Sequence, residues 1–238
     1  MIIGVNGRIG SGKDTVGKII QFLQCHSTGE ITIEDVISNP EHEWWLEEQS
    51  NFEIKKFAAK LKTVASLLTG IPVDKFEDQE FKKTNLPDEW CTLQQSGRNK
   101  VFLPMTVREL LQKLGTEAMR DGLHTNVWIN ALFADYICND DKLIRITEEN
   151  LEEWQEGDYP NWIITDMRFP NEMKGIELRQ GITIRVTRPV KKNKNIPRLH
   201  PSETSLDDAK FDYEIINDGT IEDLVEKVRE ILIKENII

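Results

Sequence analysis

The first 23 residues constrain the fold of this chain more than any other segment. Residues 2 to 5 are continuously apolar, which is typical of a strand buried on both faces of a parallel sheet. A glycine-rich turn follows, and then an apolar stripe at helical spacing: Val16, Ile19, Ile20 and Leu23. The intervening Lys18 and Gln21 are expected to face water. A buried strand that leads through a tight turn into a helix predicts an α/β fold.

The turn between this strand and this helix reads GRIGSGK, residues 7 to 13, and fits the G-x-x-x-x-G-K pattern of the P-loop. Its glycines let successive backbone N–H groups point inward, and the following helix presents its positive end to an anion. A glycine-rich turn without a ligand is the alternative, which the strand–turn–helix context disfavours. The pattern predicts a site for the phosphates of ATP, formed by Gly7, Gly10, Ser11, Gly12, Lys13, Asp14 and Thr15.

The position after Lys13 departs from the usual motif. Asp14 stands where the P-loop has Ser or Thr, and a hydroxyl appears one residue later, at Thr15. Either side chain could hold Mg²⁺, Asp14 through a water molecule, so Mg²⁺ with ATP is the expected cofactor. The alternative is that Asp14 is only an acid at a helix N-terminus, where the helix dipole favours it.

Further strands and helices are predicted along the chain. Apolar runs indicate strands at 52–57, 162–165, 182–186 and 213–216. Helical stripes are expected at 58–68 and 126–138, and Thr106 and Thr220 are expected to cap two more helices. The stripe of the helix after Thr106 comprises Val107, Leu110, Leu111, Leu114 and Ala118. Together these elements predict a three-layer α/β/α fold of the P-loop NTPase type, with a mostly parallel central sheet of about five strands.

Several segments, in one order along the chain, resemble the phage-type deoxynucleoside monophosphate kinases. They are GSGKDT at 10–15, RELLQKLGTEAMR at 108–120, ITDMRFPNE at 164–172, and HPSETSLDD followed by FDYEIINDGTIEDL at 200–224. The resemblance implies transfer of the γ-phosphoryl group of ATP to a deoxynucleoside 5'-monophosphate. It also implies small nucleotides as partners, in the supply of nucleotides for DNA synthesis.

The resemblance assigns roles to individual residues. Lys13, Arg108, Asp166 and Arg168 are the implied catalytic residues. The implied acceptor-binding residues are Arg108, Gln112, Gly115, Thr116, Arg120, Trp128, Asp166 and Arg168.

The residue chemistry leaves alternatives at several of these positions. Arg108 and Gln112 are four residues apart, so they share a helix face that can grip a phosphate and read a base edge, or can be a solvated flank. Trp128 offers a plane on which a base can stack, and a core tryptophan is the alternative. Asp166 follows a buried strand, where it could reach magnesium or orient the acceptor, or could pair with Arg168.

A basic stretch interrupts the acidic chain. Residues 178–202 contain no acid, and they carry Arg179, Arg185, Arg188, Lys191, Lys192, Lys194 and Arg198. Part of the stretch is strand, but 189–201 is expected to be a loop that closes over the triphosphate, with a functionless charged loop as the alternative.

Some motif members have no clear role. The tripeptide Asn217-Asp218-Gly219 would lie near the adenine or form an ordinary turn. Lys62, in a further resembling segment FAAKLK at 57–62, has no role that the residues indicate, and the same holds for His200 and Glu203.

We interpret the chain as one kinase domain. Its core is expected at 1–72 and 160–238, an acceptor-binding insertion at 73–159, and the lid at 188–205. Residues 26–51 and 73–103 give no pattern from which elements can be assigned.

Composition limits the partners. The formal charge of −11, from 41 acidic and 30 basic residues, argues against nucleic acid or an anionic membrane as a partner of the whole surface, so an anion site must be local. The chain has no signal-peptide pattern and no run of about 18 apolar residues, which indicates a cytoplasmic protein. A homodimer is compatible with the sequence.

Three rival functions remain open at this point. Dephospho-coenzyme A kinases and phosphomevalonate-type kinases also carry short P-loops. An ATP-dependent switch protein would need a water-positioning Gln or Glu, which the sequence does not clearly offer. A silent nucleotide-binding module is disfavoured by the presence of Lys13, Asp166 and Arg168 together.

Overall fold

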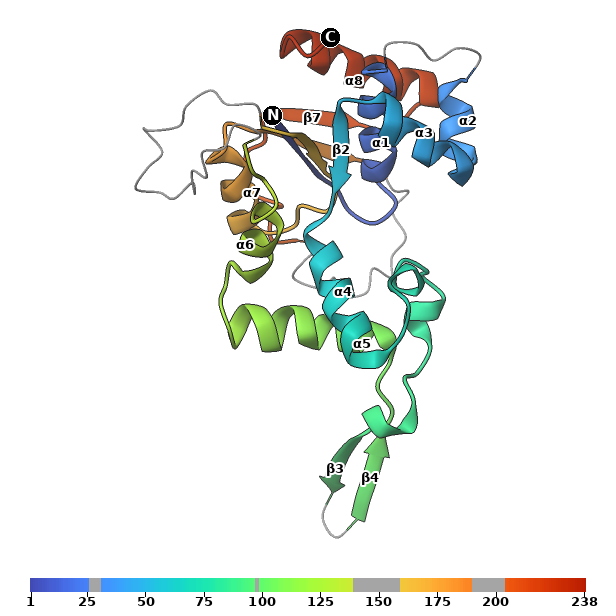
Figure 1. The fold of residues 1–238 in the computed structure, drawn as a ribbon, viewed down its shortest axis with the longest axis vertical. Coiled ribbons are helices and arrows are strands. Elements are labelled where there is room, and N and C mark those ends of the chain that lie inside the picture. Colours follow the sequence, from blue (N-terminus) through green and yellow to red (C-terminus); the bar gives the residue numbers. More distant parts are fainter. Residues whose placement is uncertain (26–30, 97–98, 139–158, 190–203) are drawn as a thin grey trace. The chain divides into compact units, whose positions relative to one another are not determined.

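The computed structural model describes residues 1–25, 31–96, 99–138, 159–189 and 204–238. The chain divides into two compact units (Figure 1). The first comprises Met1–Lys56 and Phe133–Ile238, and the second comprises Phe57–Leu132. In the described residues, no helix has both the length and the apolar character that a membrane crossing needs.

The first unit is built on a five-stranded parallel sheet with the order β2-β5-β1-β6-β7. Strand β1 is central, and Ile3 pairs with Ile163 on one side and with Ile182 on the other. Because all five strands are parallel, their carboxyl ends lie on one edge of the sheet. The strands are β1 (Ile2–Asn6), β2 (Phe52–Lys55), β5 (Asn161–Ile164), β6 (Ile182–Thr187) and β7 (Tyr213–Ile216).

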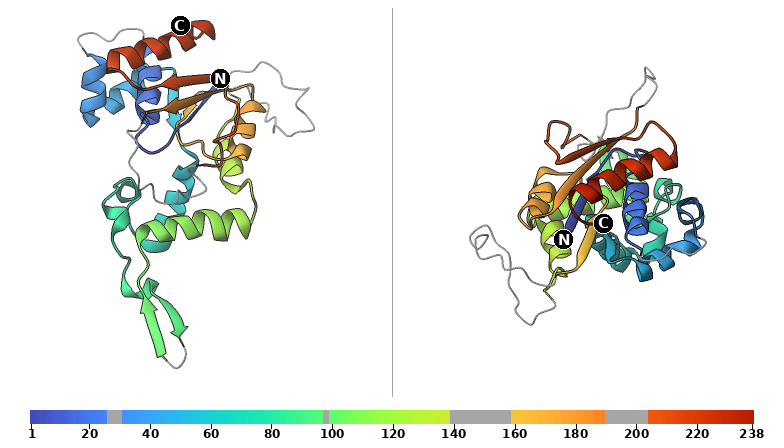
Figure 2. Two further views of the ribbon diagram at one scale, coloured as in Figure 1. Left: turned by 180° about the vertical axis from the view of Figure 1, so that it is seen from behind. Right: turned by 90° about the horizontal axis from the view of Figure 1, so that it is seen from above.

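Helices cover both faces of this sheet. Helices α1 (Lys13–Leu23) and α8 (Ile221–Lys234) pack on one face, with α2 (Ile33–Ser38) and α3 (Glu43–Gln49) beside α1. Helix α7 (Pro170–Glu177) covers the other face, as the view from above shows (Figure 2). The two faces follow from the alternation of side chains along β1: Ile3 and Val5 join the core under α1 and α8, whereas Gly4 faces Ile176 of α7. The predicted three-layer α/β/α fold is confirmed.

The prediction that Gln21 faces water is wrong. Gln21 is 2% exposed, and its Nε2 donates a hydrogen bond of 2.8 Å to the carbonyl oxygen of Phe52. The apolar stripe of α1 did reveal the buried face, but a polar side chain can join that face when its amide finds a partner. The partner here is the backbone of β2, which neighbours one other strand only.

Other element boundaries also differ from the sequence predictions. The strand predicted at 52–57 ends at Lys55, and Phe57 already belongs to helix α4 (Phe57–Thr69). Helix α7 was not predicted. Residues 31–51, which gave no pattern, form α2, α3 and a short 3₁₀ turn at Pro40–His42.

The second unit is helical apart from one hairpin. It contains α4, α5 (Val107–Gln112), most of α6 (Val127–Phe133), and the antiparallel strands β3 (Thr92–Ser96) and β4 (Asn99–Leu103). Short 3₁₀ turns occupy Val73–Phe76, Phe81–Lys83 and Asp88–Trp90. Its core is formed by Ala65, Phe76, Leu86, Val107 and Leu110.

The helix that begins after Thr106 changes geometry partway along. The predicted capping box is present, since Thr106 Oγ1 accepts from the Glu109 N–H and Glu109 Oε2 accepts from the Thr106 N–H. After α5 the chain continues as a π-helix over Lys113–Asp121. The wider π turn changes the rotation per residue, which explains why Ala118, predicted to continue the apolar stripe, is exposed.

Replacing Gln21 with leucine should destabilise the protein. The Gln21→Leu variant leaves the Phe52 carbonyl without its donor in a buried place, so the free energy of unfolding in urea should fall by about 1–3 kcal/mol. Gln49→Leu, at an exposed position at the end of α3, is the matched control and should change it little. Equal effects of the two substitutions would contradict this account of Gln21.

Candidate active site

The P-loop lies between the central strand β1 and helix α1. Gly10 and Gly12 have φ angles of 78° and 97°, a left-handed conformation that side chains strongly disfavour. The loop is closed by a hydrogen bond of 3.0 Å from the Ser11 N–H to the Arg8 carbonyl. The Ser11 Oγ is buried without a hydrogen-bond partner among the described residues. A curled backbone with an unpaired buried hydroxyl fits the oxygens of a phosphate.

Lys13 begins helix α1 directly after this loop. Its side chain is 11% exposed, and its Nζ lies 3.5 Å from Asp14 Oδ2. A lysine held at the N-terminal end of an 11-residue helix adds a full positive charge to the partial charge of the helix dipole. The predicted P-loop residues are thus brought together, and their arrangement suits an anion.

Asp14 connects the P-loop helix to the end of strand β5. Its Oδ1 accepts a hydrogen bond of 3.0 Å from the hydroxyl of Thr165, which is fully buried. The Nζ of Lys56 lies 3.8 Å from the same oxygen. A carboxylate and a hydroxyl beside a phosphate site fit Mg²⁺, which commonly takes one or two carboxylates and completes its shell with phosphates and water.

The described residues offer no ready-made metal cage. They contain no group of three or more His, Cys, Asp or Glu side chains that could hold a metal ion.

Asp166 and Arg168 follow strand β5 at the same edge of the sheet. Because β5 neighbours β1, both residues belong to the edge that carries the P-loop. The backbone N–H groups of Arg168 and Phe169 donate to Glu172 Oε2 at 2.7 and 3.1 Å, and Glu172 is 2% exposed. Glu172 thereby fixes the backbone from which Arg168 projects.

Sequence reasoning missed Glu172. Proline at the first helical position, followed two residues later by glutamate, is the signal that could have revealed α7 and its N-terminal cap.

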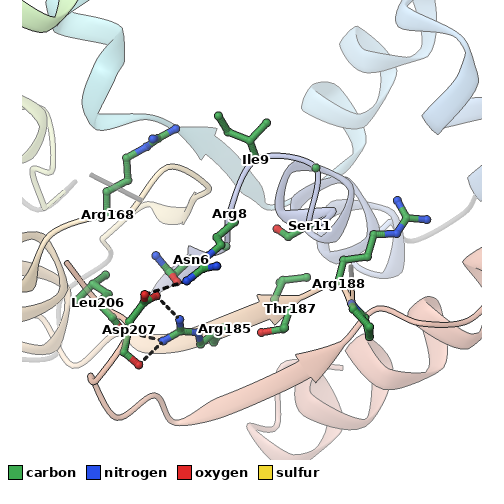
Figure 3. A pocket seen from close by; sticks show the side chains of 14 residues that line it. Asn6, Arg8, Ile9, Ser11, Arg168, Arg185, Thr187, Arg188, Leu206 and Asp207 are labelled. Atoms are coloured by element: carbon green, nitrogen blue, oxygen red, sulfur yellow. Dashed lines mark hydrogen bonds and ion pairs between the residues drawn. The ribbon is translucent and has the colours of Figure 1, made fainter. Parts of the chain in front are cut away.

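A cavity of about 510 Å³ opens on the P-loop (Figure 3). It is bounded by residues 6–11 of the loop, residues 185–189 at the end of β6, and Arg168, Leu206 and Asp207. Four arginines and one acid line it, in a protein with a net charge of −11. Positive charge therefore gathers at this cavity, which suits an anion.

Asp207 joins two of these arginines. Its Oδ2 accepts from Arg8 Nη2 at 2.8 Å and its Oδ1 accepts from Arg185 Nη2 at 3.0 Å, as the dashed lines in Figure 3 show. Arg185 Nη1 also donates to the carbonyl oxygen of Leu206 at 2.7 Å. The turn at 204–208 is therefore tied both to the P-loop and to strand β6.

Arg179, the first basic residue of the stretch, packs within the fold and does not line this cavity. Its guanidinium lies 3.7 Å from the centre of the Phe133 ring, and its Nη1 donates to the carbonyl oxygen of Gly175 at 2.8 Å. Burial lowers the pKa of Arg179 to about 10. Residues 190–203 of the expected lid lie outside the described residues, and so do His200 and Glu203.

The residues implied as the acceptor site lie mostly in the second unit. Arg108 is half-buried on α5 and its Nη2 donates to Gln79 Oε1 at 3.1 Å, while Gln112 is exposed at the end of α5. Gly115, Thr116 and Arg120 follow on the π-helix. Such π segments often occur at functional sites. Whether this surface meets the P-loop of the first unit stays a prediction.

Trp128 and Lys62 are both buried in the second unit. Trp128 is 5% exposed, and its Nε1 donates to the carbonyl oxygen of Gly115 at 2.9 Å. The indole thus supports the π-helix, as the core alternative anticipates, and stacking on a base stays a prediction. Lys62 is 8% exposed and pairs with Glu77, which gives it a structural partner.

A P-loop between a central parallel strand and a helix, with arginines around one cavity, is typical of nucleotide-binding proteins of the P-loop class. The profile of the family "Deoxynucleotide monophosphate kinase" matches residues 39–228. The chain belongs to this family. The match begins after the P-loop at residues 7–13. The P-loop therefore supports nucleotide binding independently of the family match.

Proteins similar to this chain include two from bacteriophages. The deoxynucleoside-5'-monophosphate kinase of Escherichia phage T5 is 25% identical over 247 residues, which span 91% of this chain and 89% of that protein. The deoxynucleotide monophosphate kinase of Enterobacteria phage T4 is 28% identical over 134 residues, or 56% of this chain and 48% of that protein. These similarities favour neither a dephospho-coenzyme A kinase nor a phosphomevalonate-type kinase.

Replacing Arg185 with lysine should loosen the cavity rim. An ammonium group cannot reproduce the fork of hydrogen bonds to the Leu206 carbonyl and the Asp207 carboxylate. The free energy of unfolding of Arg185→Lys should fall by about 1–2 kcal/mol in urea denaturation. Arg229→Lys on α8, where the side chain is 41% exposed, should have no measurable effect. An unchanged stability of Arg185→Lys would contradict the proposed anchoring.

Proposed function

We propose that the protein transfers the γ-phosphoryl group of ATP to the phosphate of a deoxynucleoside 5'-monophosphate and so forms the diphosphate. One observation carries the proposal. A P-loop cavity rich in arginine occurs in a chain whose family acts on deoxynucleotide monophosphates. Phosphoryl transfer needs positioning and charge neutralisation more than covalent chemistry by the protein, and this site offers both.

The donor half of the reaction is assigned to the P-loop. The backbone N–H groups of Gly10, Gly12 and Lys13 and the buried hydroxyl of Ser11 would bind the phosphates of ATP. Lys13 would neutralise the β- and γ-phosphates. Arg8 and Arg188, which line the same cavity, add positive charge around the triphosphate.

Asp14 is the residue that we assign to the metal. Its carboxylate would hold Mg²⁺ directly or through water, beside the Thr165 hydroxyl to which it is bonded, with Thr15 as a second oxygen donor. A bound magnesium ion supplies charge neutralisation for the transferring phosphoryl group. The hydrogen bond from Thr165 holds the Asp14 carboxylate toward the end of β5.

The acceptor half is assigned to two sets of residues. Asp166 and Arg168 would orient the acceptor phosphate at the P-loop edge of the sheet and stabilise charge on the transferred group. The set from the second unit comprises Arg108, Gln112, Gly115, Thr116, Arg120 and Trp128. In this set Arg108 can grip a phosphate with two parallel hydrogen bonds, and Gln112 can read a base edge.

Replacing Lys13 with alanine should nearly abolish turnover. Without the ammonium group, the donor phosphates lose their closest protein charge, so kcat should fall about 1000-fold while the far-UV circular dichroism spectrum stays unchanged. Lys234→Ala, at an exposed position on α8, is the matched control and should retain the wild-type rate. A near-normal kcat in the Lys13→Ala variant would end the assignment of this P-loop as the donor site.

An acceptor panel should identify the substrate. With labelled ATP, we expect diphosphate formation from one or more of dTMP, dGMP, dCMP and dAMP, and slower reaction with the ribose counterparts. Formation of ADP should require the acceptor, because an ATP-dependent switch protein would hydrolyse ATP without one.

The same panel tests the second unit. Arg108→Ala should raise the KM for the acceptor about 10-fold and leave the KM for ATP unchanged. The reason is that the substitution removes a guanidinium group that would bind the acceptor phosphate and not ATP. Phosphorylation of dephospho-coenzyme A or phosphomevalonate in preference to every deoxynucleotide would overturn the proposed function.

A further inference from the structure

Asn217 links the last strand of the sheet to the P-loop. It directly follows β7, and its backbone N–H donates to the Thr187 carbonyl oxygen at 2.8 Å. Its side-chain Nδ2 donates to the carbonyl oxygen of Ser11 at 2.9 Å, and the residue is only 9% exposed. The two residues are 206 positions apart in the sequence, so the sheet, and not a local turn, brings them together.

This hydrogen bond fixes the direction of one peptide group in the P-loop. A trans peptide carries its C=O and its N–H on opposite edges of one plane. Because the Ser11 carbonyl points at Asn217, the Gly12 N–H must point the opposite way. Successive N–H groups around a left-handed residue form an anion-binding concavity, and Gly12, with φ of 97°, is such a residue.

Gly12 and Asn217 are matched to each other. A Cβ atom on residue 12 would lie 2.5 Å from Asn217 Nδ2, closer than any real contact allows. Glycine at this position therefore serves two purposes. It adopts the left-handed conformation without strain, and it lets the amide approach the loop backbone.

The contact requires an amide donor. An aspartate at position 217 would set a carboxylate oxygen against the Ser11 carbonyl oxygen and place a negative charge beside a loop that receives phosphates. The side chain is also committed to the loop backbone and buried. The sequence interpretation, in which residues 217–219 lie near the adenine or form an ordinary turn, did not include this contact.

We propose that Asn217 is a positioning residue for the phosphoryl donor. It holds the Ser11–Gly12 peptide so that the Gly12 N–H binds a phosphate of ATP, and it acts without touching the base. The inference rests on the proposed function, since it takes ATP as the ligand of this loop.

Nucleotide affinity tests the proposal. Dissociation constants of the full-length protein would be measured with Mg²⁺ by competition against a fluorescent ATP analogue, using ATP and inorganic tripolyphosphate as ligands. Asn217→Ala should weaken both ligands about 10-fold, because one hydrogen bond is lost. Asn217→Asp should weaken both about 100-fold, because repulsion is added to that loss.

Comparison of the two ligands separates phosphate positioning from base recognition. Equal losses for ATP and tripolyphosphate support the proposal, because the loop peptide contacts only phosphate. A loss of affinity confined to ATP would mean that Asn217 recognises the base. An unchanged affinity for both ligands would mean that Asn217 does not orient the Ser11–Gly12 peptide for phosphate binding. Either result would overturn the proposal.

Steady-state kinetics adds a readout that a purely structural role would not move. In the Asn217→Ala variant, the KM for ATP should rise while the KM for the acceptor stays unchanged. Asn51→Asp is the matched control for Asn217→Asp: it makes the same chemical change at an exposed residue before β2, away from the carboxyl edge of the sheet. It should retain wild-type affinity and rates.

Folding must be separated from positioning. Thermal melting without ligand should show that Asn217→Ala, and the milder Asn217→Ser, remain folded. If every substitution at 217 prevents folding, Asn217 is a residue of the fold and the proposal falls. A wild-type protein that binds neither ATP nor tripolyphosphate would instead refute the proposed function itself.

Discussion

The central position of strand β1 is the constraint on which the rest of the site depends. β1 is paired with β5 on one side and with β6 on the other, and all three strands run in the same direction. Whatever follows these strands must therefore gather at one edge of the sheet. The P-loop follows β1, Asp166 and Arg168 follow β5, and Arg188 follows β6. The residues of the candidate phosphate site are thus brought together by the strand order.

The sequence predicted the elements whose signals are local. The apolar run of β1, the glycines of the loop and the stripe of α1 are contiguous, so each supports the others. The helix caps at Thr106 and Thr220 are equally local, and both are present. Strand β7 was predicted with its observed bounds, because it is a short β-branched run between turn signals.

Contacts between distant segments could not be predicted in this way. Nothing near Gln21 in the sequence indicates that its amide donates a hydrogen bond to the Phe52 carbonyl. Likewise, nothing near Asn217 indicates that its amide donates to the Ser11 carbonyl. The Asp207 bridge between Arg8 and Arg185 depends on the β1–β6 pairing in the same way. The acceptor residues were assigned by resemblance, and their relation to the P-loop stays a prediction because they belong to a separate unit.

The long sequence separations around the P-loop have a consequence for synthesis of the chain. Residues 7–13 are translated well before Arg185, Asp207 and Asn217, which follow about 170 to 210 positions later. The loop cannot acquire its final shape while these partners are missing, since each is supplied by a strand or turn added late. Nucleotide-binding capacity should consequently emerge only after Asn217 has been translated, whereas the helical second unit, made of nearby segments, can fold earlier.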